Sequence, residues 1–193
     1  MVLYRFCVFG LWLIAATALS AVPLGQGSST ERPENATKET DTEAAIEAID
    51  VARADVVEAL SKAPLGFRRI LFVSDIPEGF AAYEPRGDNV FASGEPLIVY
   101  AEPIGVSWAK EGEEVTAKLV VDFEIRQPDG QVLAGQKGFG EFALSAREPP
   151  LDFMTHIKID VTEAQAGSYI LGLTLRDING GGSHETDLPF EIR

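Results

Sequence analysis

The sequence predicts a mainly β protein: an antiparallel β-sandwich preceded by one alanine-rich α-helix and an amino-terminal signal peptide. Three observations predict this order. A basic start and a short apolar run open the chain, an alanine-rich stretch with helical spacing follows, and from Phe67 onward apolar residues recur with a period of two. Because no crossover helices separate the alternating segments, a sandwich is favoured over a fold of parallel strands.

Residues 1–21 have the pattern of a secretory signal peptide. Arg5 precedes a short apolar run, and the small residues Ala18-Leu-Ser-Ala21 stand where a signal peptidase would cut. We therefore expect an extracytoplasmic protein, periplasmic or secreted, whose mature chain starts at Val22. The alternative is an uncleaved anchor, since residues 6–22 come to about the 17 residues of the shortest membrane span.

The composition excludes some partners and one source of stability. The only cysteine, Cys7, lies in the signal segment, so the exported chain has no disulfide and depends on core packing. With 30 acidic against 16 basic residues, the formal net charge is −14. Such a chain repels nucleic acid and anionic membranes. We expect no nucleic-acid binding, and membrane contact only through an uncleaved signal segment.

A flexible tether is predicted for residues 22–40, which are rich in Gly, Ser, Thr, Glu and Pro. A helix is predicted for residues 41–63. Thr40-Asp-Thr-Glu43 matches a capping box at its start, and Ala63-Pro64-Leu-Gly66 ends it.

An apolar stripe runs along this helix, because its apolar residues recur at alternating spacings of four and three. Two interpretations remain open. The stripe packs on the following domain, or it pairs with a protein partner or a second copy. The candidate partner-binding residues are Ala45, Ile49, Ala52, Val56 and Leu60.

The sandwich domain is predicted for residues 65–193. Its clearest strand puts Val115, Leu119 and Phe123 on one face and mostly polar residues on the other. Pro128-Asp-Gly130 and Asn179-Gly-Gly-Gly182 are turn signals, and Pro189 places the last strand at an edge or a bulge. The predicted strands cover residues 67–75, 97–102, 115–126, 138–144, 153–161, 169–175 and 188–192.

Three segments resemble an immunoglobulin-like sandwich in a family of uncharacterised exported bacterial proteins. They are Ala166-Gly167-Ser-Tyr169 with the strand after it, Leu188-Pro-Phe-Glu-Ile192, and Phe91-Ala-Ser-Gly-Glu-Pro-Leu-Ile-Val-Tyr100-Ala-Glu102. The resemblance implies that the Tyr169 hydroxyl donates a hydrogen bond back across the corner before its strand. The antibody-type cysteine pair is absent, and so is the strand tryptophan that packs against it, so antigen-receptor recognition is not implied.

No catalytic residue, metal site or cofactor is predicted. His156 and His184 lack a partner motif and are expected at the surface. Asp122 and Glu124 alternate with cations on the outer face of a strand, as on a solvated surface. The loop after Asp177 has too few ligands for calcium or zinc and is expected to be a plain hairpin loop.

Aromatic residues give an alternative to protein binding. Trp108, Tyr83 and Tyr100 are candidate ligand-binding residues that would form a shallow platform for a sugar or an extended peptide. Trp108 would otherwise close one end of the core.

The leading functional hypothesis is a non-enzymatic exported module that binds another protein, or builds an envelope assembly, through the helix stripe or an open sheet edge. The alternative is a small carbohydrate-binding or hydrolytic domain that uses Trp108 and nearby acidic residues.

Overall fold

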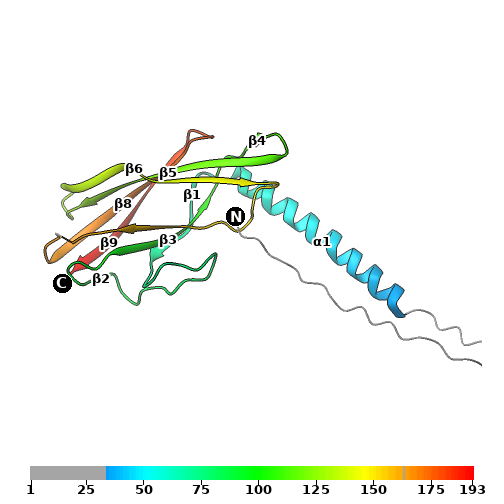
Figure 1. Ribbon diagram of the computed structural model, residues 1–193, viewed down its shortest axis with the longest axis horizontal. Helices are drawn as coiled ribbons and strands as arrows, with labels where there is room; N and C mark the ends of the chain where they lie inside the picture. The colour runs from blue at the N-terminus through cyan, green and yellow to red at the C-terminus, as the bar shows by residue number, and fades with distance from the viewer. Residues whose placement is uncertain (1–33, 163) are drawn as a thin grey trace, which may run out of the picture. The chain divides into compact units, whose positions relative to one another are not determined.

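The structure is a computed structural model, and it describes residues 34–162 and 164–193 of the chain. The expected signal peptide, residues 1–21, and most of the expected tether lie outside the described residues. Within them the protein is mainly β, with one helix and two sheets (Figure 1). No helix among the described residues is both long enough and apolar enough to cross a membrane.

Helix α1 spans Glu34–Lys62, so it begins before the predicted start near Thr40. The end of the expected tether, residues 34–40, is therefore helical rather than flexible. The physical reason is that no Gly or Pro interrupts the chain from Glu34 to Lys62, so good helix formers such as Ala36 extend the helix past the capping-box pattern. The helix ends where the sequence predicted, and Lys62 pairs with Glu58 one turn earlier.

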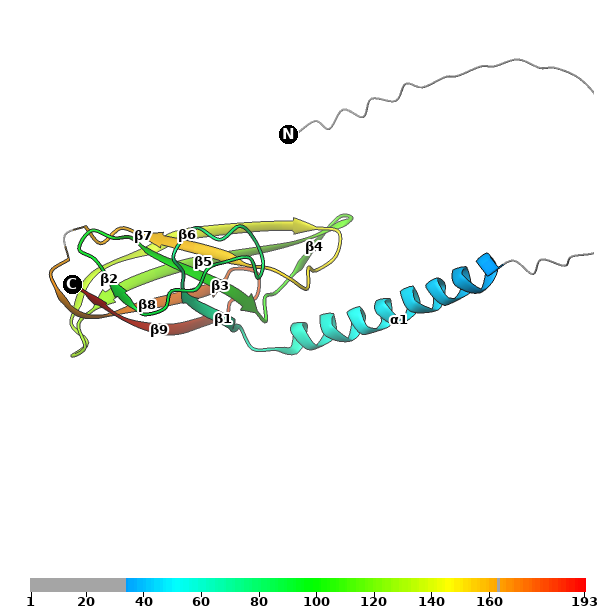
Figure 2. The same cartoon turned by 90° about the horizontal axis from the view of Figure 1, so that it is seen from below.

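Two sheets make up residues 66–192, which we call the two-sheet domain. The smaller sheet has the order β1-β3-β7, and the larger has the order β2-β9-β8-β5, with β4 and β6 both paired to β5 (Figures 1 and 2). All strand pairs are antiparallel except β2 with β9, which is parallel. The strands are β1 (Gly66–Phe72), β2 (Val90–Phe91), β3 (Leu97–Ile104), β4 (Ala109–Glu111), β5 (Glu114–Arg126), β6 (Val132–Ala146), β7 (Thr155–Ile159), β8 (Gly167–Asp177) and β9 (Ser183–Ile192).

One hydrophobic core joins the sheets. The inward residues of β5 and β8 alternate as predicted, and they meet inward residues of β1, β3, β7 and β9 in a single cluster. Because both sheets contribute their apolar faces to it, burial of these side chains is what holds the sheets together. Its least exposed members are Phe91, Leu97, Val99, Leu171 and Leu175.

The turns lie where the sequence predicted them, and the structure adds two short strands that were not predicted. Gly130 adopts a φ of +92°, as its turn between β5 and β6 requires. The short strands β2 and β4 were not predicted, since two or three residues are too few to show an alternation. Pro189 pairs with Ile170 in regular register, and β2 joins the other side of β9 only at Glu191 and Ile192. No strand on that side therefore requires the N–H that Pro189 lacks.

Tyr169 forms the hydrogen bond that the resemblance implied. Its hydroxyl donates to the Gln165 carbonyl oxygen at 2.7 Å, and its ring stacks on Phe190 with centroids 5.5 Å apart. The tyrosine therefore closes the corner that leads into β8.

Candidate functional site

The last turns of α1 lie against one end of the two-sheet domain, close to Trp108. They form a small apolar pocket of about 60 Å³. This volume corresponds to about two water molecules at their share of liquid volume, far below the roughly 300 Å³ of a small-molecule site. The lining residues are Val57, Leu60, Ser61, Pro103, Ile104, Gly105, Val106, Trp108, Pro149, Pro150, Leu151 and Phe153.

Trp108 is half-buried in this pocket and does not lie in the shared core. Trp108 thus covers one end of the domain, as the alternative expected, and the side chains beside it include residues of α1. Arg53 of α1 adds an ion contact to Glu148, with Nε and Oε2 3.6 Å apart, and both side chains are well exposed. Such a contact contributes little by itself. Apolar packing is what seats the helix end.

Only part of the helix stripe packs against the two-sheet domain. Leu60 is half-buried in the pocket, whereas Ala45, Ile49, Ala52 and Val56 are exposed. Ile49 is 65% exposed and Val56 44% exposed. The end of the stripe therefore packs on the domain, as the first interpretation expected, and its beginning has large apolar side chains in solvent.

A row of acidic residues borders the exposed part of the stripe. Glu43, Glu47 and Asp50 follow at spacings of four and three, so they share one side of the helix, next to Ile46. All three side chains are exposed. Ile46 is 53% exposed, which widens the apolar surface between Ile49 and the acids. The exposed part of the helix therefore combines an apolar surface with an acidic flank.

Tyr83 and Tyr100 come together, but away from the pocket of Trp108. The segment after β1 covers the outer face of β3, where Val73, Ile98 and Tyr100 form a second small core with Tyr83 against it. The two tyrosine rings have centroids 4.1 Å apart with planes tilted by 30°. Tyr100 is fully buried, and burial raises the pKa of its hydroxyl. Its ring is therefore not available as a platform for a sugar.

The hydroxyl of Tyr100 is fully engaged. It donates to Glu102 Oε1 at 2.7 Å and accepts from the Ala81 amide at 3.0 Å. Ala81 has a φ of 58°, a left-handed conformation that costs an alanine about 1–2 kcal/mol. The hydrogen bond from its amide holds that conformation in place.

Glu102 is a buried carboxylate that the sequence did not single out. It is 2% exposed, and Arg68 Nη2 approaches its Oε2 at 2.5 Å. The neighbouring Arg69 donates from Nη1 to the Tyr83 hydroxyl at 2.9 Å. Arg68 itself is 55% exposed, so only the carboxylate side of this pair is buried, and loss of the arginine would leave that buried charge without its cation. The cluster therefore anchors the covering segment, and its polar atoms are directed at one another.

Arg86 explains the resembling segment that begins at Phe91. Its guanidinium lies 4.1 Å from the Phe91 ring centroid, contacts Glu95 at 2.5 Å and donates to the Val90 carbonyl oxygen at 2.6 Å. The hydrogen bond from the Ala92 amide, and to a lesser extent the Arg86 guanidinium, hold the pKa of Glu95 below its usual range. The Phe-x-x-x-Glu spacing therefore closes a structural turn around one arginine.

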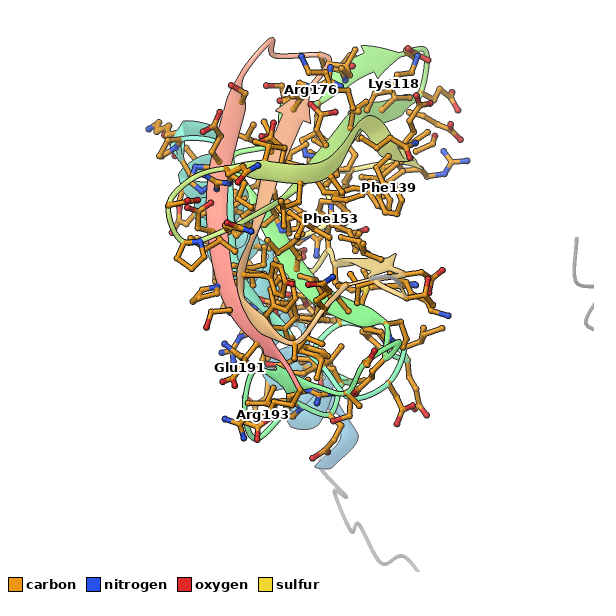
Figure 3. The ribbon with its side chains drawn as sticks, turned by 90° about the vertical axis from the view of Figure 1, so that its left-hand side faces the viewer. Lys118, Phe139, Phe153, Arg176, Glu191 and Arg193 are labelled. Atoms are coloured by element: carbon orange, nitrogen blue, oxygen red, sulfur yellow. The ribbon has the colours of Figure 1, made fainter. Side chains whose placement is uncertain are left out.

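The outer face of the larger sheet carries a structural ion pair. Arg176 of β8 donates from Nε and Nη2 to Asp122 of β5, at 2.9 and 2.8 Å, and the Gly138 amide donates to the same carboxylate at 2.6 Å. These hydrogen bonds lower the pKa of Asp122, and the largest contribution comes from Arg176. Figure 3 shows Arg176 and Lys118 projecting from this face. Asp122 is thus a carboxylate paired with an arginine across two strands of the sheet.

The two histidines differ in their surroundings. His156 is exposed on β7, opposite Tyr100. His184 is half-buried, with its ring edge-on to Phe67 at 5.7 Å, so the expectation of an ordinary surface histidine is wrong for this residue. The alternation of β9 turns its even-numbered residues inward, and the strand starts earlier than residue 188.

The loop after Asp177 is held by hydrogen bonds within the protein. The buried Asp177 carboxylate accepts from the amides of Ser107, Asn179 and Gly180 at 2.7, 3.0 and 3.1 Å. Its oxygens therefore serve the hairpin loop. Among the described residues, no group of three or more His, Cys, Asp or Glu side chains has the geometry to hold a metal ion.

Comparison with known proteins identifies no family. No family model and no curated protein matches the chain. Three similar solved structures are a β-glucuronidase from Bacteroides uniformis (18% identity, TM-score 0.34), a family 123 glycoside hydrolase from Clostridium perfringens (10%, 0.36) and the CARDB domain of the PF1109 protein from Pyrococcus furiosus, in complex with di-metal ions (13%, 0.30). In the same order, the matches span 66%, 68% and 69% of this chain, and 13%, 27% and 96% of the matched chains. At these TM-scores the matches assign neither a fold family nor an activity.

Proposed function

We propose that the chain is an extracytoplasmic, non-enzymatic interaction module in which an immunoglobulin-like sandwich carries a helix that binds another protein. Two features support the immunoglobulin-like class. Tyr169 and Gln165 form the tyrosine corner of that fold. The strand order β1-β3-β7 against β9-β8-β5-β6 corresponds to strands A, B and E against G, F, C and C′.

Export rests on the signal pattern of residues 1–21. Expression of the whole chain in a bacterial host tests it directly. Amino-terminal sequencing of protein from the extracytoplasmic fraction should give Val22 as the first residue. Recovery of the intact chain in the membrane fraction would instead support an anchored module, and recovery in the cytoplasm would contradict export.

One observation carries the binding role: the exposure of Ile46, Ile49 and Val56 on the same stripe whose end is already seated on the domain. Apolar side chains of this size gain free energy when a partner covers them, roughly 1.5–3 kcal/mol for each that becomes fully buried. The stripe therefore presents a surface that a second helix can cover.

The charge of the helix favours one class of partner. Glu43, Glu47 and Asp50 border the stripe, so two copies of this surface would bring like charges together. A basic amphipathic helix would pair its cations with this row while its apolar face covers the stripe. We assign the partner to that class, a helical segment of another exported protein with Lys or Arg beside its apolar face.

A basic amphipathic peptide of leucine and lysine, measured by calorimetry against the chain from Val22, tests the assignment. Ile49→Gln should weaken binding about tenfold, which corresponds to 1.4 kcal/mol. Val51→Gln is the matched control, because Val51 is 58% exposed but lies off the stripe. Equal effects of the two substitutions, or equal binding of an acidic peptide, would contradict the proposal.

The carbohydrate-binding alternative has less support. The pocket beside Trp108 is small and apolar, and the Tyr100 ring is buried. Sugar sites need polar groups that fix the hydroxyls and room for a ring.

A further inference from the structure

Strand β6 forms one outer edge of the larger sheet. It pairs with β5 along Val132–Ala146, and no other strand within residues 34–162 and 164–193 pairs with it. Register irregularities interrupt its first half, whereas residues 140–146 pair with β5 without a break. On the inner side, Phe139 and Phe153 fill the space between β6 and β7 (Figure 3). The unbroken half therefore has a partly packed inner face and a backbone edge that no described strand pairs with.

The unbroken half of this edge lacks the usual protection. Monomeric proteins blunt exposed edges with lysine, proline or bulges. Residues 140–146 read Gly-Glu-Phe-Ala-Leu-Ser-Ala, with Glu141 as the single charge and neither lysine nor proline. Phe142 and Leu144, on the core side, are only half-buried. A further strand would complete both the hydrogen bonds and the burial.

We propose that residues 140–146 pair antiparallel with the same residues of a second copy of this chain, about a twofold axis at Ala143. In this register Phe142 lies opposite Leu144 of the second copy, so the apolar row that includes Leu119 continues across the interface. Glu141 lies opposite Ser145 of the second copy, and no like charges meet. The interface is isologous and does not involve the α1 stripe.

Other registers fit less well. An axis at Glu141 would place the two carboxylates opposite each other, which is unfavourable. An axis nearer either end would run the pair into the irregular residues before Gly140, or past the end of β6 at Ala146. Ala143 is the position that pairs the whole regular stretch with itself.

Sedimentation equilibrium of the chain from Val22 tests this pairing. The interface is small, so we expect a concentration-dependent dimer. It should be strengthened at 0.5 M salt, because the chain from Val22 has 15 basic and 30 acidic residues and copies of net charge −15 repel each other. Ser145→Lys places a cation opposite Glu141 of the second copy and should tighten the dimer severalfold. Ser145→Glu places two carboxylates there and should weaken it by a similar factor.

Ser168→Lys and Ser168→Glu are the controls, since they make the same charge changes at an exposed residue of β8, away from this edge. Thermal unfolding of each variant checks that it is folded, because the Ser145 hydroxyl also donates to Glu114 at 2.5 Å. A chain that stays monomeric at millimolar concentration and high salt overturns the proposal. So does a dimer that responds equally to changes at Ser145 and Ser168, or one that is lost with Ile49→Gln.

Discussion

The backbone of Pro64 lies directly against Gly105, where the linker after α1 passes over the turn that follows β3. A Cβ on Gly105 would lie 2.3 Å from the Pro64 carbonyl oxygen and 2.6 Å from that of Ala63. Gly105 also has a φ of +69°, in the left-handed region. Both features require glycine, so the linker and the turn form one packed joint that seats the end of α1.

Substitution of Gly105 should loosen this joint. Gly105→Ala adds the strain of a left-handed alanine and forces the linker away, and we expect a loss of about 3 kcal/mol or more in the free energy of unfolding. Urea denaturation measures it. Gly112→Ala is the matched control, because Gly112 has a φ of +66° but nothing within 4 Å of the added Cβ, and it should lose only about 1 kcal/mol. Equal losses would contradict the close approach.

The Asp122 and Arg176 pair predicts a pH dependence of stability. The folded state lowers the pKa of Asp122, so the pair stabilises the protein above the ordinary carboxyl pKa of about 3.9 and loses this effect as the pH falls through the lower folded value. Asp122→Asn should cost about 1–2 kcal/mol at pH 7, a range reduced for the partly exposed arginine.

The difference in unfolding free energy between the wild type and Asp122→Asn should stay constant above about pH 5 and shrink below about pH 4. Urea titrations at a series of pH values measure it. Glu113→Gln serves as the control, because its pair with Arg147 is almost fully exposed. A difference that grows on acidification would contradict the lowered pKa.

The strands that the sequence predicted best are those with one face in solvent. β5 and β8 alternate cleanly because their outer residues, such as Asp122 and Arg176, remain polar. β3 is different, since the segment after β1 covers its outer face and nearly every residue is buried. A continuous burial leaves no alternation to read, so the burial of Glu102 beneath the covering segment was missed.

The candidate sites depended on contacts between distant segments, which periodicity does not report. The sequence marked Tyr83, Tyr100 and Trp108 as aromatics of interest, but only folding brings the two tyrosines together and puts Trp108 against α1. The exposed part of the helix stripe was predictable as an apolar face. Which of its turns the domain covers was not, because that depends on where Pro64 meets Gly105.

Removal of the Tyr100 hydroxyl should free the segment that covers β3. Tyr100→Phe leaves the Ala81 amide and the buried Glu102 carboxylate without this partner, and we expect a loss of about 2–3 kcal/mol. Tyr83→Phe removes only the bond from the exposed Arg69 and should lose less than about 1 kcal/mol. Limited proteolysis should cut the Tyr100→Phe variant within residues 74–86 first. Equal protection of both variants would contradict an anchoring role.

Trp108→Ala separates a packing role from a ligand-binding role. The substitution removes a wall of the pocket that seats Val57 and Leu60, so we expect a loss of about 2–4 kcal/mol and faster amide exchange in the last turns of α1. Exchange within β5 and β8, which belong to the shared core, should change only through the global stability. If Trp108 instead formed a sugar platform, the variant would keep its stability and its helix protection and lose binding to immobilised glycans. Native-state hydrogen exchange alongside a glycan-binding assay therefore distinguishes the two roles in one variant.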